Sequence, residues 1–194
     1  MNTLSKRIGI FSLIIIAFTL TACGAEVHSS LHIEDDYYED DNYVTEYHPI
    51  SEPPHLFQFH IIDTYGTNTE FDEFIFTALS PYINAGEFEV YWEMESDEDY
   101  WVELRINDYP TTDGSLLISS DYCGPYYFCH DQQYQFCEYT PGLSINCETP
   151  SEEFHSAYIG GLLYTLPQDL YLILQICDSN FYYCEYETRR VSLE

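Results

Sequence analysis

The stretch EFEVYWEME, residues 87–95, alternates between polar and apolar side chains, and YWVELRIN, residues 100–107, does the same. Successive side chains of a strand point to opposite faces of a sheet, so a period of two predicts strands with one buried face. Six further stretches are strand candidates: LFQFHIID, SLLISSDY, YQFCEYT, LSINCE, LYLILQIC and YYCEYETRRVSL. Seven or eight short strands within residues 55–194 predict a mainly all-β fold, an antiparallel β-sandwich.

One stretch departs from the strand pattern: TPSEEFHSAYIGG, residues 149–161. Thr149 suits an N-cap, Pro150 suits the first helical position, and Glu152 completes a capping box. The pair of glycines at the end of the stretch would stop the helix, so we expect one short helix here. FDEFIFTALSPY, residues 71–82, fits either a helix or a strand.

The two alternating stretches are close in sequence, and we expect them to pair as a hairpin. Their apolar side chains must then share one face, which fixes the parity of the register. The other face has Glu93 opposite Glu103 and Tyr91 opposite Arg105, beside Trp101. Tyr91, Trp101 and Arg105 therefore form a candidate binding face for sugars or peptide side chains, unless another segment covers the aromatic rings.

An acidic turn separates the same two stretches. Asp97, Glu98 and Asp99 supply oxygen ligands of the kind that Ca²⁺ prefers. The turn is thus a candidate calcium site, and the alternative is a turn whose carboxylates are simply solvated. We expect no other metal or cofactor.

The first residues have the features of an export signal. A short basic segment precedes an apolar run from residue 8 to 20, which is too short to cross a bilayer as a stable helix. Leu20-Thr21-Ala22-Cys23 resembles the lipobox of bacterial lipoproteins. The resemblance implies that residues 1–22 are a signal peptide and that Cys23 becomes the lipidated N-terminus. Gly24 follows in place of the inner-membrane retention aspartate, which by family analogy favours the outer membrane of a diderm bacterium.

Residues 23–54 have a different composition from the rest. After Cys23 they contain nine carboxylates and no basic residue, and they end in Pro-Pro. Low hydrophobicity with a high like charge predicts a flexible acidic tether. The expected organisation is a signal peptide over 1–22, the lipidated cysteine and tether over 23–54, and a single domain over 55–194.

Six cysteines remain once Cys23 is assigned to lipid, and all lie between residues 123 and 184. An even, clustered set in an exported chain predicts disulfides, and the absence of any C-x-x-C spacing argues against a zinc site. Many pairings are open. We expect the local closures first: Cys177–Cys184, Cys123–Cys129 and Cys137–Cys147.

Basic residues are scarce against 34 acidic ones, for a net charge of −29. Beyond residue 22 the chain has no lysine, which excludes Walker A loops, pyridoxal phosphate Schiff bases and Ser-x-x-Lys acylation centres. Nucleic acid is not an expected partner because phosphate binding needs a basic patch. No nucleophile-elbow, zinc-protease or phosphate-loop motif is present.

The closing stretch LPQDLYLILQICDSNFYYCEYETRRVSL, residues 166–193, resembles the final hairpin of immunoglobulin-like or fibronectin-like extracellular domains. The resemblance implies an interaction module. The leading hypothesis is a non-enzymatic, lipid-anchored envelope protein that binds another protein or a glycan. The alternatives are a carboxylate-dependent hydrolase of envelope polymers, and a divalent-cation-binding or passive structural surface lipoprotein.

Overall fold

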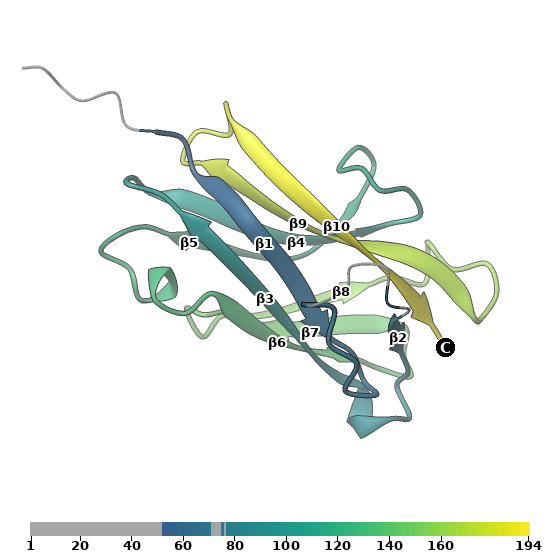
Figure 1. Ribbon diagram of the computed structural model, residues 1–194. Coiled ribbons are helices and arrows are strands. Elements are labelled where there is room, and N and C mark those ends of the chain that lie inside the picture. The colour runs from purple at the N-terminus through teal and green to yellow at the C-terminus, as the bar shows by residue number, and fades with distance from the viewer. Residues whose placement is uncertain (1–51, 71–74, 76) are drawn as a thin grey trace, which may run out of the picture. The chain divides into compact units, whose positions relative to one another are not determined.

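The computed structural model describes residues 52–70, 75 and 77–194 (Figure 1). The predicted signal peptide, the lipobox with Cys23 and nearly all of the predicted tether lie outside these residues. Within them, no helix has the length and apolar character needed to cross a membrane.

Ten strands form two sheets of five strands each in the part of the chain that the structure describes. The first sheet has the order β1 (His55–Ile62), β3 (Glu87–Glu95), β6 (Tyr134–Tyr139), β7 (Ser144–Glu148) and β8 (Phe154–Tyr158). The second sheet has the order β2 (Thr77–Leu79), β10 (Cys184–Leu193), β9 (Gln168–Asp178), β4 (Tyr100–Asn107) and β5 (Leu116–Cys123). All pairings are antiparallel except the parallel pairing of β10 with β2. The prediction of a mainly all-β fold is confirmed, while the likeness to immunoglobulin-like or fibronectin-like domains stays a prediction.

The two sheets form two layers (Figure 1). Their facing sides are buried in one hydrophobic core. The first sheet contributes side chains such as Phe59 and Trp92, and the second contributes Leu104 and Leu172. Burial of one large apolar side chain stabilises a domain by about 1.5–3 kcal/mol. The apolar half of each alternating stretch therefore fixes which face of its strand points inward.

The predicted hairpin between residues 87–95 and 100–107 is wrong. β3 pairs with β1 and β6, whereas β4 pairs with β5 and β9, so the two strands lie in different sheets. The link between them crosses the sandwich, and the Ser96 hydroxyl donates to the backbone oxygen of Glu98 at 2.9 Å within it. The predicted inward faces are nevertheless right, because strands in facing sheets bury their apolar sides toward each other just as hairpin strands do.

The predicted helix over residues 149–161 is also wrong. The segment is the turn of the β7–β8 hairpin, followed by β8 itself. The Thr149 hydroxyl does cap a backbone N–H, that of Glu153 at 3.3 Å, but Glu152 has a φ of 61° and reverses the chain. Capping residues suit turns as well as helices, and the burial of Ala157 and Ile159 in the core favours the strand.

The three predicted disulfides are present: Cys123–Cys129, Cys137–Cys147 and Cys177–Cys184. The second joins directly opposite residues of β6 and β7, and the third does the same for β9 and β10, each with 4.1 Å between the Cα atoms. The first ties the end of β5 to η2 (Phe128–His130), a single 3-10 turn. Each sheet therefore has one covalent link between adjacent strands.

Candidate functional site

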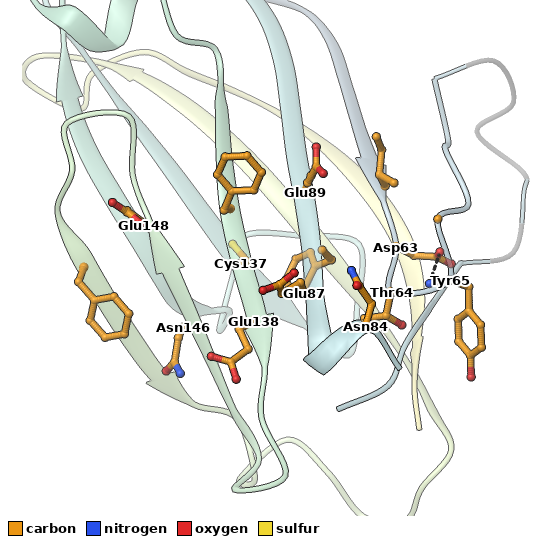
Figure 2. Close-up of a pocket in the computed structure, with 15 residues that line it drawn as sticks. Asp63, Thr64, Tyr65, Asn84, Glu87, Glu89, Cys137, Glu138, Asn146 and Glu148 are labelled. Carbon is orange, nitrogen blue, oxygen red and sulfur yellow. Dashed lines mark hydrogen bonds between the residues drawn. The ribbon is translucent and has the colours of Figure 1, made fainter. Parts of the chain in front are cut away.

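A groove of about 810 Å³ lies on the outer face of the first sheet, at the end where β1 finishes and β3 begins. We call it the acidic groove. Its floor consists of outward side chains from β3, β6, β7 and β8, and one wall is the segment Asp63–Gly66 that follows β1. Figure 2 shows Glu87 and Glu138 near the middle, with Glu148 and Asn146 on one side and Tyr65 on the other.

The strand register arranges four of the floor residues in a line across the sheet. Glu89 of β3 is opposite Phe136 of β6, Phe136 is opposite Glu148 of β7, and Glu148 is opposite Phe154 of β8. We call this line the mixed row, because carboxylates alternate with phenyl rings. Both rings are open to solvent, with exposed fractions of 53% for Phe136 and 72% for Phe154.

A second line, the polar row, runs parallel to the mixed row. It consists of Glu87, Glu138, Asn146 and Ser156, each opposite the next in the register. The Ser156 hydroxyl donates to Asn146 Oδ1 at 2.7 Å. Like charges directly opposite each other destabilise a sheet, so the Glu87–Glu138 pair is unfavourable unless a cation lies nearby.

No basic side chain among the described residues forms an ion pair with the glutamates of the polar row. Glu87, Glu138 and Glu148 have neither an ion pair nor a side-chain hydrogen bond among the contacts of the described residues. Glu89 accepts a hydrogen bond from the Tyr91 hydroxyl, and this bond raises the pKa of Tyr91 to about 12. The acidic groove is therefore a region of uncompensated negative charge.

The arginines of the domain are all elsewhere, on the second sheet. Arg105 of β4 pairs with Glu103 at 2.9 Å, and Arg189 of β10 pairs with Glu187 at 3.2 Å. Arg190 pairs with Asp169 of β9.

Asp63 holds the wall of the acidic groove in place by backbone hydrogen bonds. Asp63 is buried and accepts backbone N–H bonds from Tyr65 at 3.0 Å, Thr67 at 2.7 Å and Ala78 at 2.9 Å. Its carboxylate is therefore occupied in holding the loop and is not free for a ligand. The Tyr65 hydroxyl donates to Glu194 at 2.6 Å, which fixes the ring beside the opening.

A glycine positions the start of β3. Gly86 ends η1 (Asn84–Gly86), the 3-10 turn that leads into Glu87, and has a φ of 80°. A Cβ at this position would collide with the backbone oxygen of Tyr139. Only glycine combines this backbone conformation with such a close approach, so the turn sets where Glu87 enters the groove.

The three residues of the predicted binding face are not brought together. Tyr91 lies on the first sheet, where it stacks on His60 with ring centroids 5.0 Å apart, next to the acidic groove. Burial lowers the pKa of His60 from its ordinary value, which disfavours a positive charge on this ring. Trp101 and Arg105 lie on β4, and Trp101 packs on Phe181 at 5.8 Å.

The acidic turn that was a calcium candidate does not gather its carboxylates. Asp97 and Glu98 are exposed, and Asp99 accepts a hydrogen bond from the Tyr122 hydroxyl at 3.1 Å. Among the described residues, the one group close enough to share a metal ion is Asp121 with two cysteines, and those cysteines are joined in a disulfide.

Sequence reasoning missed the acidic groove, although part of its signal was visible. The alternation of residues 87–95 already pointed Glu87 and Glu89 outward. The order of β6, β7 and β8 beside β3 was not visible, and β8, which bears Phe154, was predicted as a helix. No protein-family model matches this chain, and neither a curated protein nor a solved structure matches it.

Proposed function

We propose that this protein is a non-enzymatic, lipid-anchored protein of the cell envelope that binds another protein or a glycan in the acidic groove. The carrying observation is the mixed row, in which exposed phenyl rings alternate with carboxylates that have no cationic partner among the described residues. Rings supply apolar contact area, and carboxylates accept directed hydrogen bonds and ion pairs. This combination is typical of recognition sites.

The proposed location rests on two features of the chain. The lipobox resemblance at Cys23 implies export and lipidation, with the outer membrane of a diderm bacterium as the destination. Three disulfides support an oxidising compartment, because thiols in the cytosol are kept reduced. Both features agree with a domain displayed outside the cytoplasm.

The hydrolase alternative has one observation in its favour, because Glu87 and Glu138 face each other in the acidic groove. Hydrolases of this class need one carboxylic acid held in a water-poor, apolar environment. Both glutamates are exposed to water, and Asn146 beside Glu138 is polar. The geometry therefore favours binding over acid–base catalysis.

The proposal is tested by capturing partners from the envelope with three versions of the full-length protein. Each version has a C-terminal tag, and crosslinking goes through carboxylates because the mature chain has no lysine. The groove variant combines Glu87→Gln with Glu138→Gln. The matched control combines Glu93→Gln with Glu95→Gln, which removes the same amount of charge from β3 alone, outside the groove.

We expect one stoichiometric partner that is captured by the wild type and the control but is lost with the groove variant. A partner retained by all three versions would contradict recognition through the Glu87–Glu138 pair of the groove. The absence of any specific partner, with lipidation of Cys23 confirmed by mass spectrometry, would contradict the proposed function and favour the passive structural alternative.

A further inference from the structure

We infer that the ligand of the acidic groove is an extended protein segment that carries arginine side chains. This inference rests on the proposed function and names the chemistry of the partner. Its starting point is charge, since Glu87 and Glu138 are opposite each other without a counter-ion among the described residues. A bound cation removes this repulsion, whereas a neutral sugar leaves it in place.

A bare divalent cation does not fit the described geometry. Ion binding requires several ligand oxygens converging on one point, and the carboxylates of the acidic groove do not form such a cluster. Glu89 and Glu148 are separated by Phe136 in the mixed row, which spans two strand spacings, or about 10 Å. The charges of the mixed row are therefore spread along a line, as an extended ligand would need.

The exposed rings favour arginine over lysine. A guanidinium is planar, so it stacks on a phenyl face and simultaneously donates two hydrogen bonds to a neighbouring carboxylate. In the mixed row each exposed ring has a glutamate directly beside it. A lysine ammonium would gain the ion pair but less of the stacking.

The domain itself contains this combination of groups. The Arg189 guanidinium lies over the Phe59 ring, 5.3 Å from its centroid, and also pairs with Glu187 at 3.2 Å. Arginine, phenyl ring and glutamate are thus compatible in one arrangement within this chain. The mixed row offers the ring and the carboxylate of that arrangement and lacks the guanidinium.

The spacing of the carboxylates suggests the spacing of the arginines. An extended polyproline II segment rises about 3.1 Å per residue and repeats its face every third residue, so arginines three residues apart are about 9 Å apart on one face. That distance is close to the separation of Glu89 and Glu148 across the mixed row. The natural probe is a peptide with three arginines separated by Pro-Pro pairs.

Isothermal titration calorimetry of the full-length protein in a neutral detergent tests the inference with this peptide. The control peptide has glutamine in place of each arginine, and a neutral chitin oligosaccharide represents a glycan. We expect saturable binding of the arginine peptide, no binding of the control peptide, and weaker binding as salt rises from about 50 to about 300 mM. The Glu87→Gln/Glu138→Gln variant should bind about tenfold more weakly, and the Glu93→Gln/Glu95→Gln control should stay within about twofold of the wild type.

Three results would overturn the inference. If the control variant loses as much affinity as the groove variant, the peptide senses only the net charge of the chain. If the arginine peptide does not bind, or binds no better than the glutamine peptide, the ligand chemistry is wrong. If the oligosaccharide binds and the groove variant abolishes that binding, the ligand is a glycan, which contradicts this inference but retains the proposed function.

Discussion

The two sheets of the sandwich differ in whether their charged side chains are paired with charges of opposite sign. The strands of the first sheet have six glutamates and neither lysine nor arginine, and its acidic groove is left open. The strands of the second sheet also have six acidic residues, but they include three arginines, each paired with a carboxylate. The arginines of the second sheet thus pair with carboxylates of the domain. The carboxylates of the acidic groove on the first sheet have no such partner among the described residues. Arginine charge is paired within the second sheet, whereas the carboxylates of the acidic groove on the first sheet are available to a ligand.

The largest effect on stability should come from removing the disulfide that joins adjacent strands in each sheet. Replacing Cys137 and Cys147 with alanine removes a bridge between two strands of the acidic groove, and replacing Cys177 and Cys184 removes its counterpart on the second sheet. Each pair should lower the free energy of unfolding by about 2–4 kcal/mol. Urea titration at fixed pH measures the free energy of unfolding of both variants. If only one of them is destabilised, the two disulfides are not equivalent.

The next effect tests whether charge on the second sheet is structural. Arg189 has a side chain only 12% exposed, so Arg189→Met should cost about 1–3 kcal/mol by leaving Glu187 unpaired and uncovering Phe59. The neighbouring Arg190 has a side chain 63% exposed and serves as the matched control. Arg190→Met should change the free energy of unfolding by less than about 0.5 kcal/mol. If Arg189→Met and Arg190→Met lower the free energy of unfolding equally in urea titrations, Arg189 has no special structural role.

The same measurement on the first sheet should have the opposite sign. Glu87→Gln removes one member of the like-charge pair with Glu138, so the domain should gain up to about 0.5–1 kcal/mol. Glu93→Gln changes the same strand outside the acidic groove and should be close to neutral. A loss of stability with Glu87→Gln would mean that the pair is already compensated. A stabilised variant that fails to bind would also exclude unfolding as the reason.

The smallest expected effect concerns pH on the first sheet. The hydrogen bond to Glu89 raises the pKa of Tyr91 from 10 to about 12, so folding favours the protonated hydroxyl. This contribution to stability is fully present below pH 10 and is lost as the pH rises toward 12. The urea midpoint of the wild type should therefore fall as the pH rises from 10 toward 12, and Tyr91→Phe should make this fall smaller. An unchanged alkaline fall would show that the bond does not hold the proton.

The sequence predicted those features that depend on local pattern. Period-two alternation identified β3 and β4 and their buried faces, and short cysteine spacings identified the bridges. The pairing of β9 with β10 agrees with the hairpin that residues 166–193 resemble. The partners of β3 and β4 were not predictable, since burying Trp92 and Leu104 on one side of a hairpin or across a sandwich gains similar hydrophobic energy. The capping residues around Thr149 were ambiguous because one hydroxyl caps a helix or a turn with the same bond.

The candidate site was harder to predict than the fold, for a physical reason. The mixed row takes one residue from each of four strands that span residues 89 to 154, so it exists only once all the registers are set. Phe136 and Glu148 are both outward on their own strands, but nothing near them in sequence says that they are neighbours. Sites assembled across a sheet in this way leave no contiguous motif.

The direction of β1 keeps the start of the domain away from the acidic groove. The strand starts at His55, and the acidic groove borders its far end at Ile62, about 25 Å away for eight residues in extended form. The chain therefore enters β1 at the end of the strand that is remote from the acidic groove. A substitution or insertion just before His55 should accordingly leave the groove residues in place.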